Sequence, residues 1–478
     1  MKRLFIASMI CSLLVGCANE QAKQPNIVVV ICDDLGYADV GFNGSPDITT
    51  PTLDQLAAGG TIFTSGYVAH PFCGPSRAGL MTGRYPHEYG AQFNIPANSG
   101  DRPGYGIPVT ETFMSKMLQS AGYYTGAIGK WHLGGGAAFH PNQRGFDDFY
   151  GFLGGGHEYF PAVYQAKYQK QKEAGRAVIH DYLQPLEHNG EQVKETEYIT
   201  DALSREAVRF VEDAAQKNQP FFLYLAYNAP HSPLQAKEED LAMFDHIEDP
   251  KRKKYAAMVY AVDRGVSKLV ESLKATGEYD NTLIVFLSDN GGKVVLGANN
   301  YPLQNGKGSI SEGGYRVPMF FHWPDHVPAG QKYAYPVTAI DFYPTFAGLG
   351  GAKLPAGKQL DGVNIWEDFL AGKNPRDGQM IFAMRHWPGY SDVGARMNEW
   401  KVLKQDNKPW QLYNVDTDMA EQNDLSETYP DKVQDLVLRA KKWSEEHAEP
   451  RWFDPESLRE DWVEKDMAKF NGVFDIDQ

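Results

Sequence analysis

Four runs of apolar residues have the length and the β-branched or aromatic content of buried strands. They span residues 27–31, 123–128, 221–225 and 283–287. Between them lie stretches in which apolar residues recur at helical spacing. These stretches span residues 52–58, 111–120, 201–215 and 255–273. Strands that alternate with helices predict an α/β fold, in which helices cover both faces of a mainly parallel sheet.

The alternation of strands and helices stops after about residue 375. Residues 400–403 and 410–413 have the pattern of antiparallel strands, and residues 431–445 that of an amphipathic helix. We therefore expect a catalytic α/β domain at residues 25–375 and a smaller C-terminal α+β subdomain at residues 376–478.

Residues 1–24 have the pattern of an export signal followed by a tether. Lys2 and Arg3 precede an apolar stretch that is too short to span a bilayer. Gly16 directly before Cys17 resembles a bacterial lipobox, in which Cys17 would carry a lipid. An ordinary secretory signal with a chance cysteine is the alternative. We expect an exported bacterial lipoprotein in the periplasm or at the outer membrane, attached to lipid only through Cys17.

Charge and cysteine content exclude two classes of protein. A formal net charge of −15 argues against a nucleic-acid-binding protein. Once Cys11 leaves with the signal and Cys17 is lipidated, only Cys32 and Cys73 remain, which is too few for a disulfide framework. Cys32 ends an apolar run and is interpreted as a buried small hydrophobe. Cys73 lies among Gly, Pro, Ser and Arg, so it needs another explanation.

Polar side chains follow each of the four predicted strands, and in open α/β sheets ligands bind beyond the carboxyl ends of the strands. In strand order these side chains are Asp33 and Asp34; Lys130 and His132; His231; and Asp289 and Asn290. The carboxylate and amide side chains offer only oxygen ligands, which suits Ca²⁺, with Mg²⁺ as the alternative. Each of them singly would be interpreted as a turn or cap residue. Together they predict a hard-cation site beside a basic cluster.

Cys73 opens a predicted helix, because Pro75 suits a first turn and Gly83 suits a helix end. Free N–H groups and the helix dipole favour an anion at such an N-terminus, and Arg77 can reach the same place. From these residues alone, Cys73 is either a thiol nucleophile activated by the dipole or an adventitious cysteine.

The run from Cys73 to Gly83 resembles the signature of type I sulfatases, whose cysteine is oxidised to formylglycine. Residues 33–36, 129–134, 229–231, 288–292 and 306–314 resemble further blocks of that family, in the family's order. The likeness covers roughly residues 25–425. It implies the alkaline-phosphatase-like fold, a mainly parallel sheet sandwiched by helices with a smaller C-terminal subdomain. It also implies hydrolysis of sulfate esters by S–O cleavage.

The resemblance implies a role for each residue of the site. A hydrated formylglycine at position 73 offers a gem-diol, of which one hydroxyl attacks sulfur and the second collapses to expel sulfate. The implied metal ligands are Asp33, Asp34, Cys73, Asp289 and Asn290. Asp289 also helps to deprotonate the attacking hydroxyl, His132 takes the proton of the second hydroxyl, and His231 with Lys307 protonates the leaving oxygen. Arg77 and Lys130 hold the sulfate and the gem-diol, and a maturation enzyme forms the formylglycine.

The substrate is expected to be a sulfated oligo- or polysaccharide. Carrageenan, ulvan, fucoidan and host glycosaminoglycans stay open, with an algal galactan such as carrageenan as a first suggestion. His157, after a glycine-rich loop, and Arg385 are the expected substrate contacts. A phosphonate monoester or phosphodiester hydrolase of the same superfamily and a non-catalytic glycan-binding lipoprotein are the alternative functions.

Overall fold

The computed structural model describes residues 23–97, 104–467 and 472–474. Its centre is a ten-stranded sheet in the order β11-β2-β10-β9-β1-β8-β4-β5-β6-β7. The bounds are β1 Asn26–Cys32, β2 Thr61–Phe63, β4 Tyr124–Lys130, β5 Asp148–Phe152, β6 Glu187–His188, β7 Glu191–Gln192, β8 Phe221–Ala226, β9 Thr282–Ser288, β10 Met319–His322 and β11 Gln331–Tyr333. The export signal with Cys11 and Cys17 lies outside the described residues.

The four predicted strands are confirmed as β1, β4, β8 and β9, and they are neighbours in the sheet. β1 pairs in parallel with both β8 and β9, and β4 pairs in parallel with β8 and β5. Antiparallel pairs occur only towards the two sides of the sheet, where β10 pairs with β9 and β2, and β6 pairs with β5 and β7. The carboxyl ends of the four predicted strands therefore lie along one edge of the sheet.

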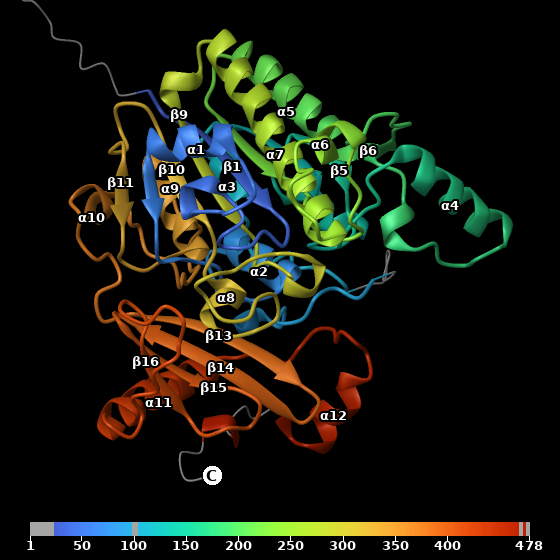
Figure 1. Cartoon of the computed structure of the whole chain (residues 1–478). Coiled ribbons are helices and arrows are strands. Elements are labelled where there is room, and N and C mark those ends of the chain that lie inside the picture. Colours follow the sequence, from blue (N-terminus) through green and yellow to red (C-terminus); the bar gives the residue numbers. More distant parts are fainter. Residues whose placement is uncertain (1–22, 98–103, 468–471, 475–478) are drawn as a thin grey trace, which may run out of the picture.

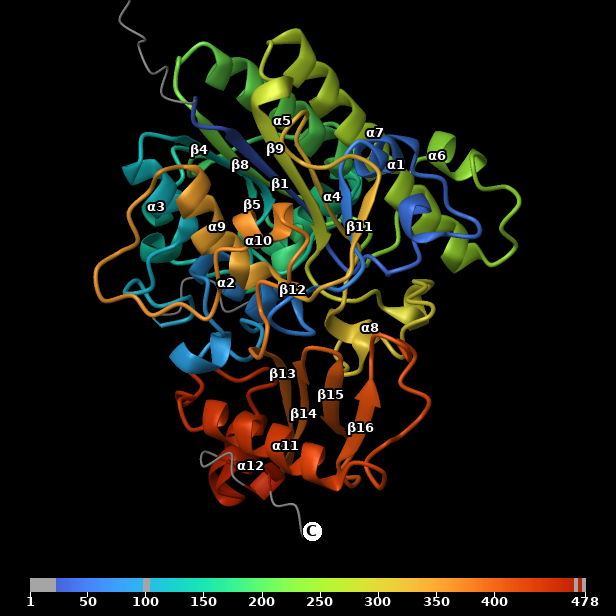
Figure 2. The same cartoon turned by 90° about the vertical axis from the view of Figure 1, so that its left-hand side faces the viewer.

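Helices cover both faces of this sheet (Figures 1 and 2). The helices of the catalytic part are α1 Pro51–Ala58, α2 Cys73–Thr82, α3 Met114–Ser120, α4 Pro161–Glu173, α5 Ile199–Ala215, α6 Glu238–Ala242, α7 Pro250–Ala275, α8 Glu312–Tyr315, α9 Phe342–Leu349 and α10 Trp366–Leu370. Alternate residues of β1 enter two separate cores: Val29 packs with the core of α2, α3 and α9, and Val28 packs with the core of α1, α5 and α7. No described helix is both long and apolar enough to cross a membrane.

Two helix starts differ from the prediction by three or more residues. α7 begins at Pro250, five residues before the apolar spacing does, because the Asp249 side chain accepts hydrogen bonds from the N–H groups of Lys251 and Arg252. α3 begins at Met114 rather than at residue 111. The carboxylate of Glu111 is held instead by Arg84, at 2.6 Å. Both starts depend on polar contacts that the apolar pattern does not record.

The C-terminal part carries a second, antiparallel sheet, with β13 Met380–Trp387, β14 Tyr390–Met397, β15 Trp400–Lys404 and β16 Gln411–Asn414. β15 and β16 confirm the two predicted strands, and α11 Pro430–Ser444 confirms the predicted helix. A short helix, α12 Leu458–Glu464, follows. Two further short strands, β3 Gly66–Tyr67 and β12 Val337–Thr338, pair with each other in the catalytic part. α2 and α8 lie between the large sheet and the C-terminal sheet (Figures 1 and 2).

A buried ionic cluster joins the two parts. Lys401 of β15 lies 2.9 Å from Glu312 of α8 and 2.8 Å from Glu421, and its side chain is fully buried. Arg316 holds the second oxygen of Glu312, also at 2.9 Å. A buried carboxylate without a cation is costly, so this cluster fixes how the C-terminal sheet sits against α8.

Replacing Lys401 with Met should therefore destabilise the protein by about 3–5 kcal/mol, because Glu421 would be left as an uncompensated buried charge. Chemical unfolding followed by tryptophan fluorescence measures the loss. Lys408→Met is the matched control, because the Lys408 side chain is 64% exposed and lies 3.9 Å from its carboxylate partner. It should change stability by less than about 1 kcal/mol. Equal stabilities of the two variants would contradict the assigned role of Lys401.

Candidate active site

The side chains expected to act together meet at the carboxyl edge of the large sheet. Asp33 and Asp34 come directly after β1, Asp289 comes directly after β9, and Lys130 is the last residue of β4. All four are buried, with at most 1% of the residue exposed. His132 and His231 follow β4 and β8 along the chain. The strand ends thus deliver these groups to one place, as the sequence predicts.

Helix α2 brings Cys73 to the same edge as its first residue. Gly83, at the other end, closes the helix in a left-handed conformation with φ 69°, which glycine adopts without strain. One turn into α2, the guanidinium of Arg77 donates from Nε to Asp289 Oδ2 at 2.8 Å. Its Nη1 donates to the Tyr224 hydroxyl at 3.2 Å. Arg77 is therefore held by β8 and β9 and ties the nucleophile helix to the sheet.

Two further ion pairs complete the charge balance. Lys130 Nζ lies 2.6 Å from Asp33 Oδ2, and Lys307 Nζ lies 2.6 Å from Asp34 Oδ1. Lys307 Nζ is also 3.6 Å from the sulfur of Cys73. Each of the three buried carboxylates thus has its own cation, and all three cations surround residue 73.

Burial and the neighbouring charges shift the pKa values of the carboxylates and of the Cys73 thiol. Burial and the negative charge of Asp33 raise the pKa of Asp289 to about 6. Burial alone would raise the pKa of Asp34, but Lys307 outweighs it and holds that pKa below its ordinary value. Burial raises the pKa of the Cys73 thiol despite Lys130 and Lys307. A thiolate nucleophile, the alternative that the helix N-terminus suggested, is therefore disfavoured.

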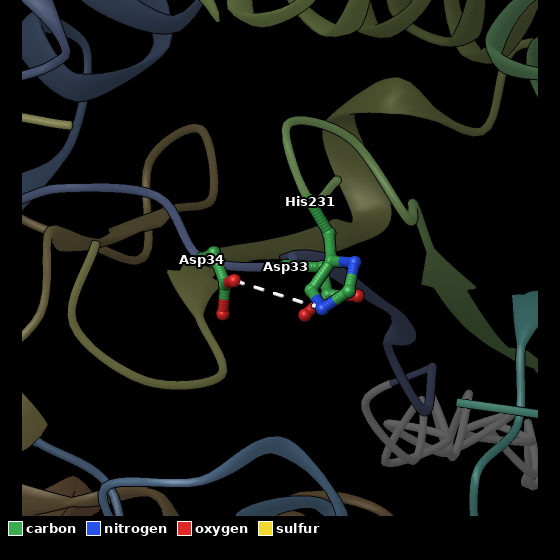
Figure 3. Close-up of side chains that lie close together, drawn as sticks. All are labelled: Asp33, Asp34 and His231. Carbon is green, nitrogen blue, oxygen red and sulfur yellow. Dashed lines mark ion pairs between the residues drawn. The ribbon is translucent and has the colours of Figure 1, made fainter. Parts of the chain in front are cut away.

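Both histidines are held neutral. His231 Nε2 lies 3.7 Å from Asp34 Oδ2, with Asp33 beside the pair (Figure 3). Burial and Lys307 lower the pKa of His231 to about 3. Burial and the charge of Lys130 hold the pKa of His132 well below its usual range, and its Nδ1 is buried without a hydrogen-bond partner. His132 also has a backbone φ of 60°, an uncommon conformation outside glycine that is typical of functional sites.

The oxygen atoms around Asp33 fit a divalent metal ion. Oδ1 of Asp33, Oδ2 of Asp34 and Oδ1 of Asn290 are all buried and lack a hydrogen-bond partner. Ligand atoms of Asp33, Asp34 and His231 lie within 4.8 Å of one another, as do those of Asp33, Cys73 and Asp289. Buried polar oxygens are normally paired, so unpaired oxygens that converge indicate a hard cation.

Asn94 belongs to the site although no sequence motif marked it. Its Oδ1 accepts the N–H of Gly74 at 2.9 Å and lies 3.9 Å from the sulfur of Cys73. Phe72, the residue before α2, provides no side-chain cap. Asn94 supplies that cap from a loop beyond the helix, and only the folded chain reveals it.

The two residues expected to contact the substrate, His157 and Arg385, lie in different surroundings. His157 is fully buried, and its ring nitrogens lie 2.6 Å from the carbonyl of Glu158 and 2.8 Å from that of Gln184. The expectation for His157 was wrong, because both ring nitrogens serve to hold loops together. Arg385 lies at the rim of the site, donating from Nη1 to the carbonyl of Gly308 at 2.5 Å, next to Lys307.

The comparisons with known proteins agree with this geometry. The family model "Sulfatase" matches residues 25–352. This chain belongs to the sulfatase family. A second model, "N-sulphoglucosamine sulphohydrolase, C-terminal", matches residues 306–446 of the sulfatase. Membership makes the protein a sulfuric ester hydrolase.

Three relatives illustrate the family. The "Uncharacterized sulfatase YdeN" of Escherichia coli K12 is 34% identical over 421 residues, which cover 76% of this chain and 70% of YdeN. The N-acetylgalactosamine-6-sulfatase of Mus musculus is 30% identical over 84% of this chain and 76% of the mouse protein. The crystal structure of Ps i-CgsB in complex with k-i-k-neocarrahexaose is 57% identical, with a TM-score of 0.93, over 95% of this chain and all of that one.

The metal site predicts a thermal shift. We expect Ca²⁺ or Mg²⁺ to raise the unfolding temperature of the chelator-treated sulfatase. At a cation concentration of a hundred times Kd, the free energy of unfolding should rise by about 2.7 kcal/mol. Asp34→Asn should abolish the shift, because it removes a ligand charge. Asp263→Asn is the control: Asp263 is also a buried carboxylate, but it accepts the N–H of Leu53 on α1. A shift retained in Asp34→Asn would place the cation elsewhere.

Asn94 predicts a change in KM. Asn94→Asp keeps an oxygen for the N–H of Gly74 but adds a negative charge beside residue 73. A like charge at about 4 Å costs on the order of 1–4 kcal/mol, so KM for a sulfate ester should rise about tenfold or more. Gln92→Leu is the control, because Gln92 ties the same loop to the carbonyl of Ala448 at 3.0 Å. An unchanged KM in Asn94→Asp would limit Asn94 to capping α2.

Proposed function

We propose that this sulfatase hydrolyses sulfate esters on a sulfated galactan of the carrageenan type, with formylglycine at position 73 and Ca²⁺ as the metal. The observation that carries the proposal is the ring of Arg77, Lys130 and Lys307 around residue 73, whose charges match a sulfate group. The carrageenan type is supported by the likeness to Ps i-CgsB, whose crystal structure is in complex with k-i-k-neocarrahexaose.

The cations of the site would hold the sulfate. Lys130 and Arg77 are fully buried, and each is already oriented by one carboxylate, so little reorganisation is needed when an anion enters. Asp33, Asp34, Asp289 and Asn290 would hold the Ca²⁺, which supplies positive charge at the sulfuryl oxygens. The oxygen nucleophile would come from residue 73 in its formylglycine form.

Proton transfer is divided between lysine and histidine. Although burial opposes it, Asp34 holds the pKa of Lys307 well above its ordinary value. Lys307 is thus a protonated group 3.6 Å from the sulfur of Cys73, placed beside His231 to supply a proton to the leaving oxygen. His132 is neutral and its Nδ1 is unpaired, so it can accept the proton from residue 73.

Arg385 would bind a second anionic group of the substrate. Its guanidinium lies 3.4 Å from the ring centroid of Trp387 and 4.6 Å from that of Phe72. Its cross-strand neighbour Asp392 acts on it electrostatically, but no ion pair of Arg385 within 4.0 Å is found among the described residues. A half-buried cation that is not locked in an ion pair, beside the reaction centre, fits a neighbouring sulfate of the same saccharide.

Export and maturation rest on the sequence and on the family. A lipid-anchored protein of the periplasm or outer membrane, attached through Cys17, would meet polysaccharides from outside the cell. Conversion of Cys73 to formylglycine requires a maturation enzyme in the producing cell.

The nucleophile gives the decisive test. Cys73→Ala should lower the release of sulfate from carrageenan oligosaccharides by about a thousandfold or more, as the loss of a covalent nucleophile does. Cys32→Ala is the matched control, because Cys32 is the other described cysteine and is buried at the end of β1. Mass spectrometry of the peptide with residue 73 should show an aldehyde, which is lighter than the thiol.

Two results would contradict the proposal. A fully unmodified thiol at position 73 in active protein would exclude formylglycine. A clear preference for phenyl phosphonate over aryl sulfate would favour the phosphonate monoester or phosphodiester hydrolase. Saccharide binding without release of sulfate would favour a glycan-binding lipoprotein.

A further inference from the structure

We propose that residues 293–301 form a docking surface for the saccharide units next to the one whose sulfate is cleaved. The surface consists of Val294, Val295 and Tyr301, which we name the apolar tip. The inference rests on the proposed function, because it assumes a sulfated saccharide as substrate. It adds where the remainder of that saccharide lies.

The exposure of the apolar tip is unusual for this chain. Val294, Val295 and Tyr301 are 55%, 70% and 75% exposed. Most large apolar side chains of the described chain are buried in the two cores, and those that are exposed elsewhere are scattered along the sequence. Three exposed apolar side chains on one short segment form a patch of the kind that binds a ligand or partner.

The segment that carries the apolar tip is held firmly in this position. It begins directly after Asn290 and ends at Lys307, so both of its ends lie in the active site. The buried side chain of Asn300 bonds both the N–H and the carbonyl of Gly292, at 2.9 Å and 3.0 Å. The N–H of Asn299 donates to Asp39 at 2.9 Å. The apolar side chains are therefore presented to solvent by an anchored loop.

The apolar tip lines a groove that lies next to the reaction centre. Its residues line a cavity of about 680 Å³ together with Lys307, Arg385 and Trp387. Lys307 also lies 3.6 Å from the sulfur of Cys73, so the groove and the reaction centre share Lys307 and adjoin each other. This volume is in the range of pockets that hold whole ligands.

The two walls of the groove suit a sulfated sugar chain. One wall carries Val295 and Tyr301, on which the apolar C–H faces of sugar rings can pack. The other wall carries Arg385, whose guanidinium is stacked on Trp387 and is suited to a sulfate. Because the groove combines apolar and cationic residues and adjoins the reaction centre at Lys307, the occupant that we assign to it is the substrate chain.

Tyr301→Ala tests the docking surface. The measured quantity is kcat/KM for a carrageenan hexasaccharide divided by kcat/KM for a small aryl sulfate, which has no further saccharide units. This ratio should fall about tenfold, mainly through a higher KM for the hexasaccharide. Tyr335→Ala is the matched control, because Tyr335 is 44% exposed and does not line the groove. Its ratio should equal that of the unaltered protein.

An unchanged ratio in Tyr301→Ala would overturn the docking surface and leave the sulfatase assignment intact. Equal losses on both substrates would also overturn it, since they would indicate damage to the fold or to the reaction centre.

A second measurement separates this inference from the choice of substrate. The affinity of Cys73→Ala protein for the hexasaccharide, with and without Tyr301→Ala, is measured by calorimetry. Weaker binding in the double variant supports the surface even if turnover fails, and equal binding contradicts it. Turnover of aryl sulfate without turnover or binding of the hexasaccharide would overturn both the carrageenan type and the docking surface for it.

Discussion

The structure depends on the neutralisation of three carboxylates buried at one edge of the sheet. Asp33, Asp34 and Asp289 are inaccessible to water, and burying an unpaired charge costs several kcal/mol. Each is held by one cation that another element supplies: Lys130 from β4, Lys307 from the loop before α8, and Arg77 from α2. These ion pairs fix how the elements pack, because none of the elements can move without leaving a buried charge unpaired or exposing it to water.

This charge balance also prepares the site for an anion. The same cations that neutralise the carboxylates surround residue 73. A sulfate therefore enters a positive electrostatic environment whose charged groups are already in position. Asp33 and Asp34 each keep one oxygen without a hydrogen-bond partner, where a cation fits. Neutral histidines complete the set, because burial next to Lys130 and Lys307 keeps their pKa values low. One arrangement of charges thus stabilises the fold and is also the basis of the proposed metal binding and proton transfer.

The C-terminal sheet contributes to the same edge. Its buried Lys401 pairs with Glu312, and this pairing fixes β13 near the loop of Lys307. Arg385 of β13 then reaches the carbonyl of Gly308 and forms one wall of the groove. The segment from Asn290 to Lys307 forms the other wall and presents Tyr301. The groove that we propose for the saccharide is thus built from segments far from residue 73 in sequence, while the charged groups around residue 73 come mainly from the strand ends.

The sequence by itself determined the four central strands, the helices between them and the polar residues after each strand, because burial and alternation are local patterns. It also marked Cys73 and its helix. Only the tertiary structure decided which cation meets which carboxylate, since Lys130 and Asp33 are 97 residues apart and Arg77 and Asp289 are 212 apart. The same holds for Asn94, which no motif marked, and for His157, whose ring is enclosed by loops that the apolar pattern leaves undefined. Such contacts depend on how distant segments pack, which no local pattern records.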